Sequence, residues 1–543
     1  MKLLPEKIYC WLNIVHLDIT RPICKRILIE AFKSFIKSET VKSPFNQSIN
    51  ILLATFLIAC NALNDKKLEQ ALDNAKENRQ ELEKVLSHYE KDSAKLAAAR
   101  FLIENMPYHF TQEQYYTSSG KEQYRPEIIN FDGFQSIKSH CDSLTRRGYK
   151  IKTHNKYDIS TLDSRFLIDN IELAFTVRQK PWAKNVSFND FCKYILPYRA
   201  QCEEVSHLRK EIMERFVPIL DSAKVKTPLE ACIVLNEHLK GIMKYGHTGL
   251  PFYPTIDETY HSGISQCEGL CNLGTFIMRA CGIPVTVEQT TWTKMDLGHS
   301  WCVVLDNGKF YSFGPGEDQP DIHARSFSEV RHRRPAKVYR SRFDPDFSIM
   351  DRKDDGYVTT LKSPLIYDVT NEYLDKTTSI KVSVDKNNRK KGKSNQVYLC
   401  TYNHYEWCPI AIGHRKDTVC YFENVVGDNI FIVADSPDGS KLRNITTPFY
   451  TDKDGNIRKF IPLKEHKQTF TLNKRKKKPD QVHTLYFWDT EKDRFTPLEY
   501  VSSTDTTQTY DQIPANALLW FTIPERIVNQ RIFFIENDSI KTY

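Results

Sequence analysis

The chain lacks several features that would assign it to a simple class of protein. It contains no internal repeat and no low-complexity segment, which excludes repeat solenoids and long biased linkers. The apolar run at 51–59 is too short to cross a membrane as a helix, and no other stretch is apolar enough. The 14 cysteines show no regular spacing, so the sequence does not define a disulfide framework.

The composition predicts several folded domains. The chain has 543 residues, which is too long for one ordinary core, and 40% of them are hydrophobic. The net charge of +8 gathers in basic runs, among them Arg331–Arg334, Asn388–Lys393 and Asn473–Lys478. No aromatic-rich nucleic-acid motif accompanies these runs. We therefore interpret them as solvated loops and expect no nucleic-acid partner.

The apolar run Ile51–Ala59 ends at Cys60 and has the length of the apolar region of a signal peptide. Leu57-Ile-Ala-Cys60 resembles a bacterial lipobox, whose cysteine is lipidated and becomes the new N-terminus. This resemblance implies an exported protein in the cell envelope of a Gram-negative bacterium, lipid-anchored in the outer membrane or at the cell surface. A signal near residue 40 also implies a translation start downstream of Met1. Alternatively, 51–59 is an ordinary buried helix and Cys60 a core residue.

The most informative stretch is Ser265–Pro284, which predicts a buried helix that begins near Cys267. Apolar residues follow at helical spacing, Ser265 is a candidate N-cap, and Glu268 suits the positive end of the helix dipole. Gly282 and Pro284 end the helix. A cysteine in the first turn lies where free backbone N–H groups can stabilise a thiolate.

A histidine follows at the start of a predicted hairpin. Trp301–Leu305 is a continuous apolar run, Asp306-Asn-Gly308 is a strong type I′ turn signal, and Lys309–Phe313 returns as the partner strand. His299 enters the first of these strands. A thiol nucleophile and an imidazole base that are distant in sequence need this kind of arrangement to meet in the fold.

These motifs together resemble the core of the transglutaminase-like superfamily of papain-type thiol enzymes. The matching elements are Cys267 at a helix start, Arg279-Ala-Cys-Gly-Ile-Pro284, and Gly298-His-Ser-Trp301. The spacing to Gly-Ile-Pro selects Cys267 rather than Cys271 as the nucleophile. The matched core runs from about Thr227 to about Pro320. The resemblance implies a helix carrying the cysteine packed on an antiparallel sheet.

The third residue of the family's site departs from the pattern. The family has an Asp directly after the returning strand, and Gly314 stands at that position here, followed by Pro315. The nearest carboxylates are Glu317, which we place first, and Asp318. A backbone carbonyl or an Asn could also orient His299, or the site could be degraded.

The implied chemistry is acyl transfer at an amide bond of a peptide or protein, without a cofactor or a metal. His299 takes the proton of Cys267, or the two rest as an ion pair, and a thioester forms that water or an amine resolves. We favour hydrolysis because water needs no second binding site. The alternative is a degraded core that acts as a scaffold for binding protein or glycan. A zinc site made by Cys267, Cys271, Cys281 and His299 is a further reading, which their spacing disfavours.

We predict an α+β chain in five parts. A signal and lipobox region (1–60) precedes a helical region (61–225), the transglutaminase-like core (226–335), a β-sandwich-like module (360–470), and a further β segment or second module (471–543). In the helical region we expect a helix over Asp65–Asn105, a loop or short helices over Tyr108–Tyr124, and helical segments from Phe131 to about Lys180. The β region alternates strictly at Thr378–Asp385. Trp407 could contact sugar or cell wall, but we expect it in the core.

Overall fold

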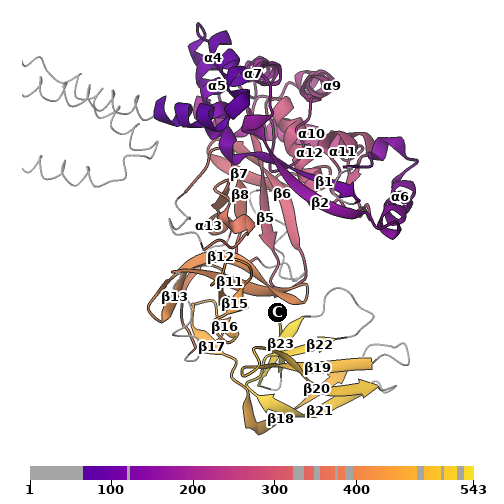
Figure 1. Ribbon diagram of the computed structural model, residues 1–543, viewed down its shortest axis with the longest axis vertical. Coiled ribbons are helices and arrows are strands. Elements are labelled where there is room, and N and C mark those ends of the chain that lie inside the picture. Colours follow the sequence, from indigo (N-terminus) through magenta and orange to yellow (C-terminus); the bar gives the residue numbers. More distant parts are fainter. Residues whose placement is uncertain are drawn as a thin grey trace, which may run out of the picture. The chain divides into compact units, whose positions relative to one another are not determined.

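The computed structural model describes residues 65–543 except 119–122, 322–334, 348–354, 374–376, 386–394, 474–481, 503–506, 523–530 and 538. The chain divides into two compact units, Met1–Glu69 and Gln70–Tyr543. The second unit combines helices with several antiparallel sheets, as expected for the α+β class (Figure 1). Cys60 and the predicted lipobox lie outside the described residues. Within the described ranges, no helix has both the length and the apolar character that crossing a membrane requires.

The N-terminal part of the second unit is mainly helical. The expected helix over Asp65–Asn105 is interrupted, because Asp92 caps a new helix by accepting hydrogen bonds from Ala94 and Lys95. The helices here are α4 (Arg79–His88), α5 (Ser93–Asn105), α6 (Phe134–Arg146), α7 (Ser164–Arg178), α8 (Phe188–Tyr194) and α9 (Arg209–Ala223).

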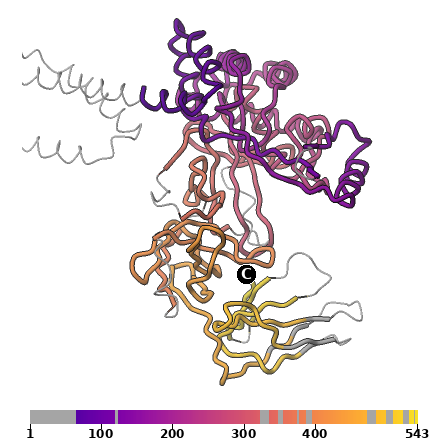
Figure 2. The backbone as a smooth tube through the Cα atoms, in the orientation of Figure 1, coloured from indigo at the N-terminus to yellow at the C-terminus, as the bar shows by residue number. Residues whose placement is uncertain are grey.

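Two strands in this region were not predicted. β1 (Phe110–Thr117) pairs antiparallel with β2 (Lys150–Tyr157) over eight residue pairs, and the two run side by side in Figure 2. The expected loop or short helices over Tyr108–Tyr124 and the helical reading of 150–157 were therefore wrong. Both strands are polar, and β2 is almost entirely exposed, so neither has the one-sided apolar alternation that reveals a strand in sequence.

The segment that contains the candidate nucleophile folds as helices against one sheet. The sheet has the order β7-β6-β5-β8-β9, and α12 packs across β5 and β6. From the sequence, the helix over Pro228–Tyr245 is expected to pack against the helix of Cys267. In the structure α9 packs on α12, while α10 packs on α9 and β6. The elements are α10 (Pro228–Leu239), β3 (Lys244–Tyr245), α11 (Ile256–Ser262), β4 (Ile264–Ser265), α12 (Cys267–Ala280), β5 (Val285–Thr291), β6 (Gly298–Asp306), β7 (Lys309–Phe313), β8 (Tyr339–Ser341), β9 (Ile366–Asp368) and α13 (Thr370–Tyr373).

Local sequence explains the ends of these elements. Thr227 and Glu230 form a capping box at the start of α10, with Pro228 in the first turn. The two residues between β6 and β7, Asn307 and Gly308, both have positive φ, 48° and 76°. This is the geometry of the type I′ turn that the Asn-Gly pair predicts.

The C-terminal part is built from strands, as predicted. An eight-stranded sheet contains β10 (Thr378–Ser383), β11 (Gln396–Asn403), β12 (Glu406–Lys416), β13 (Val419–Val425), β14 (Asn429–Asp435), β15 (Arg443–Asn444), β16 (Phe449–Thr451) and β17 (Ile457–Lys459). β18 (Leu463–Asn473) pairs with β21 (Thr507–Ala515). A five-stranded sheet contains β19 (Val482–Asp489), β20 (Arg494–Ser502), β22 (Leu519–Thr522), β23 (Ile532–Glu536) and β24 (Ser539–Thr542).

The strands β11 and β14 are buried on both faces. Leu399 and Val433 contribute to one hydrophobic core, whereas Tyr398 and Ile432 contribute to another that also contains Phe534 of β23. The second core therefore joins the eight-stranded sheet to the five-stranded one. Trp407 packs against this core, with ring contacts to Tyr402 and Trp488. Its role in packing agrees with the expectation.

Candidate active site

Cys267 is the first residue of α12, as the sequence predicts. The N-cap is Gln266 and not Ser265. Ser265 belongs to β4 and pairs with Tyr245 of β3. The Ser265 hydroxyl packs against the first turn, because a Cβ at Gly269 would lie only 2.2 Å from that oxygen. Gly269 therefore allows a close approach of the chain to the helix start, where free backbone N–H groups point outward.

The start of β6 lies against this turn. Against the effect of burial, the Ser300 backbone lowers the pKa of the Cys267 thiol, so it lies near the sulfur, and His299 is the residue before it. The His299 ring stacks on Trp292, with ring centroids 6.0 Å apart, and lies 5.9 Å from the ring of Trp301. The structure thus brings the predicted nucleophile to the strand that carries the predicted base.

The environment of the thiol favours its protonated form. Burial raises the pKa of Cys267, and the nearby Glu268 carboxylate also raises it. Backbone hydrogen bonds from Ser300 and from the helix start act in the opposite direction. Because burial is the largest influence, the thiol needs a base when it reacts at neutral pH.

The loop after β7 is held in a defined position. The Asn236 side chain donates to the carbonyl oxygens of Gly314 and Asp318 at 3.3 and 3.0 Å and accepts from the Gly316 N–H at 2.8 Å. Pro315 fits against α12 at Gly274, where a Cβ would lie 2.6 Å from the proline ring. A buried Asn on one helix and a glycine on another therefore fix this loop beside the cysteine helix.

Glu317 occupies space beside the position where the family has an Asp. A Cβ at Gly314 would lie 3.2 Å from a carboxylate oxygen of Glu317 and 3.1 Å from its Cβ. Asp318 approaches the same point with its backbone nitrogen, at 3.3 Å. The loop therefore turns the Glu317 carboxylate back toward residue 314.

The other cysteines of the helix belong to the core. Cys271 is buried, and its carbonyl oxygen faces the Cys302 thiol at 3.5 Å. The Cys281 carbonyl oxygen accepts a hydrogen bond from the Trp182 indole at 2.9 Å. Among the described residues, no group of three or more His, Cys, Asp or Glu side chains could hold a metal ion. The alternative of a zinc site is therefore not supported for its four proposed ligands, Cys267, Cys271, Cys281 and His299.

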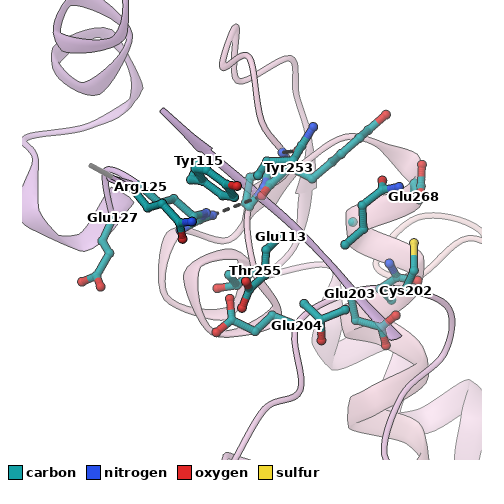
Figure 3. Close-up of a pocket in the computed structure, with 17 residues that line it drawn as sticks. Glu113, Tyr115, Arg125, Glu127, Cys202, Glu203, Glu204, Tyr253, Thr255 and Glu268 are labelled. Atoms are coloured by element: carbon teal, nitrogen blue, oxygen red, sulfur yellow. Dashed lines mark hydrogen bonds between the residues drawn. The ribbon is translucent and has the colours of Figure 1, made fainter. Parts of the chain in front are cut away.

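A cavity of about 330 Å³ lies beside the first turn of α12. Figure 3 shows side chains from several segments of the chain around it. Its walls come from β1, from residues 202–204, from residues 253–255, and from Glu268, Gly269 and Asn272 of α12. The segment from His247 to Gly263 is rich in Pro, Tyr, Thr and Gly, which predicts a loop that could form one wall of a cleft. It contributes Tyr253, Pro254 and Thr255 to the cavity.

Sequence reasoning missed several residues of this region. Asn236 could have been identified from the sequence, since it is a polar residue on the apolar side of α10. Ser300 acts through its backbone, which no side-chain motif can reveal. Glu203 and Glu204 reach the cavity from a segment more than 60 residues before Cys267.

Comparisons with known proteins add little to this picture. No family model matches the sequence, and no curated protein matches it. Among 31 solved chains with detectable structural similarity is one named "Putative Cysteine Protease from Cytophaga hutchinsonii". It has 15% sequence identity and a TM-score of 0.18, and the match covers 21% of this chain and 37% of that chain. A TM-score this low does not define the fold.

Proposed function

We propose that the protein catalyses thiol-dependent acyl transfer at amide bonds of a peptide or protein, with a papain-like, transglutaminase-like core. Cys267 is the nucleophile, His299 the base, and Glu317 the group that orients the imidazole. The position of β6 across the start of α12 carries the proposal, since the Cys302 thiol lies 3.5 Å from the Cys271 carbonyl oxygen and the Ser300 backbone acts to lower the pKa of the Cys267 thiol. The contact between Cys271 and Cys302 lies four residues from Cys267 and three residues from His299, which supports the pairing of this thiol with this imidazole.

The reaction follows from these positions. His299 accepts the Cys267 proton as the sulfur attacks the amide carbonyl carbon, and backbone N–H groups at the start of α12 stabilise the oxyanion. The amine leaves with a proton from the imidazolium, and a thioester remains. Water then loses a proton to His299, attacks the thioester, and releases the acid and the thiol. We favour this hydrolytic route over attack by a second amine.

The pH dependence of Cys267 alkylation by iodoacetamide tests the proposal, with the labelled cysteine identified by peptide mass spectrometry. We expect labelling at neutral pH that falls at least tenfold in His299→Ala and persists only at alkaline pH, where the thiol ionises without help. His466→Ala, on β18, is the matched control and should leave labelling unchanged. Labelling of Cys267 that is indifferent to His299 would contradict the proposal and favour a degraded, protein- or glycan-binding scaffold.

We also propose that the protein is exported and lipid-anchored in the cell envelope. The support is the lipobox-like sequence Leu57–Cys60 and the polar residues that follow it. The test is metabolic labelling with an alkyne fatty acid in cells that express the full chain. We expect incorporation that Cys60→Ala abolishes, and incorporation that persists in Cys60→Ala would contradict the anchor.

A further inference from the structure

The cavity beside α12 has a strong excess of negative charge. Its lining includes five carboxylates and one cation, Arg125. The Arg125 guanidinium is already paired, because it donates to both carboxylate oxygens of Glu258 at 3.0 and 2.6 Å and to the Tyr253 carbonyl oxygen at 3.2 Å. Arg125 is therefore committed to Glu258, and its charge only partly offsets the rise that burial causes in the pKa of Glu204. The lining carboxylates are Glu113, Glu127, Glu203, Glu204 and Glu268.

Glu268 is the carboxylate nearest in sequence to the candidate nucleophile. Burial and the neighbouring Glu203 raise the pKa of Glu268, and burial raises the pKa of Glu204. Within the described part of the chain, no Lys or Arg forms an ion pair with Glu268, whereas Glu113 pairs with Lys156 at 3.5 Å on the surface.

Glu203 accepts hydrogen bonds from the backbone N–H groups of Ala200 and Gln201 at 2.5 and 2.7 Å. Against the lowering effect of burial, its charge also acts to raise the pKa of the buried Arg199 and Arg279. Glu268 is therefore the lining carboxylate that a positive group entering the cavity would stabilise most.

Asn272 supplies an independent observation. It lies one helical turn after Glu268 and lines the same cavity. Only 8% of Asn272 is exposed, and its side-chain oxygen Oδ1 is buried without a hydrogen-bond partner. Buried acceptors in folded proteins are almost always satisfied, so an unsatisfied one at a cavity points to an absent donor. A ligand with an N–H or O–H donor would satisfy this oxygen.

The other lining residues and the volume of the cavity limit which class of ligand it can bind. Cys202 is another lining residue, and burial raises the pKa of its thiol to about 12, so it stays protonated and unreactive. Gly269 also lines the cavity, and the Ser265 hydroxyl fills the space that a Cβ at Gly269 would need. A volume of about 330 Å³ accommodates a long aliphatic stem with a charged head, but not a folded partner.

We infer that this cavity binds a cationic nitrogen group with N–H donors, an ammonium or a guanidinium, held by Glu268 and the Oδ1 of Asn272. The group is either the Lys or Arg side chain of a peptide substrate or a free alkyl amine. Its position next to Cys267 makes it a determinant of specificity, and this part of the inference rests on the proposed acyl transfer. Binding of the cation itself does not depend on catalysis.

Calorimetry on the full chain carrying Cys267→Ala separates binding from chemistry. The probes are N-acetyl-arginine methylamide, its citrulline analogue, which has nearly the same shape but no charge, and butylamine. We expect the arginine probe to bind at least tenfold more tightly than the citrulline probe at low salt. The isosteric change Glu268→Gln should remove most of this preference, and Glu465→Gln on β18, the same change outside the cavity, should leave it intact.

The two sources of the cation give different results. Tight binding of the arginine probe with weak binding of butylamine indicates a side chain of the peptide substrate, and the reverse indicates a free amine. Equal affinity for arginine and citrulline, or no binding of any probe, overturns the inference even where Cys267 labelling depends on His299. A preserved arginine preference without His299-dependent labelling supports the cation site and contradicts the proposed reaction.

Discussion

In the candidate site, the absence of a side chain at one residue allows the side chain of another to occupy its place. Gly314 stands where the resemblance implies an Asp, and the Glu317 carboxylate lies 3.2 Å from the point that a Cβ at 314 would occupy. A carboxylate that reaches the same place from three residues further along the chain can substitute for the missing one, because an orienting group acts through its position. The loop geometry therefore offers a specific replacement for the departure at Gly314.

The change Glu317→Gln tests whether the Glu317 carboxylate replaces the Asp that is missing at position 314. We expect His299-dependent labelling of Cys267 at neutral pH to fall about tenfold or more, since removal of an orienting carboxylate usually costs rate without abolishing the reaction. Asp318→Asn removes the neighbouring carboxylate and should have little effect. Equal effects of the two substitutions would show that the loop contributes only general negative charge.

A buried histidine gives a prediction about pH. The His109 Nε2 donates to the Phe343 carbonyl oxygen at 2.8 Å, and the two rings stack at 4.0 Å. Burial lowers the pKa of His109 from its ordinary 6.5 to about 3. Between these values the unfolded chain binds a proton that the folded chain does not, so stability falls as the pH drops below 6.5, by up to about 1.4 kcal/mol per pH unit.

The measurement is urea unfolding from pH 6.5 to 4.5. We expect His109→Gln to lose stability less steeply with falling pH than the wild-type chain, although it is less stable at pH 7. His466→Gln, at an exposed site, should keep the wild-type slope. A slope that is the same in all three proteins would mean that His109 is protonated in the folded state.

Among the elements, the packing of α12 against the loop after β7 decides whether the site is assembled. Gly274 is the contact point, because any side chain there would meet Pro315. Helix α12 also lies across β5 and β6, so it cannot move away from the loop without disturbing the sheet. Gly274, in the interior of α12, thus allows close packing of a loop that lies about 40 residues further along the chain.

Gly274→Ala tests this contact. Crowding of about one methyl group should destabilise the protein by about 1–3 kcal/mol and slow Cys267 labelling, because the loop that carries Glu317 must shift. Gly241→Ala is the control, since its nearest neighbour would lie at 3.7 Å, an ordinary contact. Thermal unfolding and labelling rates measure the two effects. A Gly274→Ala protein with wild-type values in both would show that the loop adapts freely.

In the second unit as a whole, the C-terminal strands hold the loop that precedes His299. The Asn403 side chain on β11 donates to the carbonyl oxygens of Trp292 and Leu297, both at 2.9 Å, and accepts from the Leu297 N–H. Arg531 pairs with Asp296 at 2.6 Å, and both are buried. Because Trp292 stacks on His299, the β region contributes to the position of the candidate base.

Asn403→Ala should therefore affect the candidate site from a distance. We expect a loss of about 1–3 kcal/mol from the unsatisfied loop carbonyls, faster hydrogen exchange at residues 292–298, and slower His299-dependent labelling of Cys267. Asn155→Ala, at an exposed position of β2, should change none of these. Unchanged exchange in the loop of Asn403→Ala would contradict a positioning role for the β region.

Local patterns in the sequence sufficed for the helix that begins at Cys267, the Asn307–Gly308 turn and several β strands, because caps, turns and apolar spacing depend on near neighbours. They failed for β1 and β2, which are polar and pair across some 40 residues. The return of Glu317 toward Gly314 depends on the conformation of a short loop, which no residue pattern reveals. The approach of the Ser300 backbone to Cys267 and the acidic cavity became visible only in the folded chain. Each combines groups that are distant in sequence, and their approach is set by how helices and sheet pack rather than by any local motif.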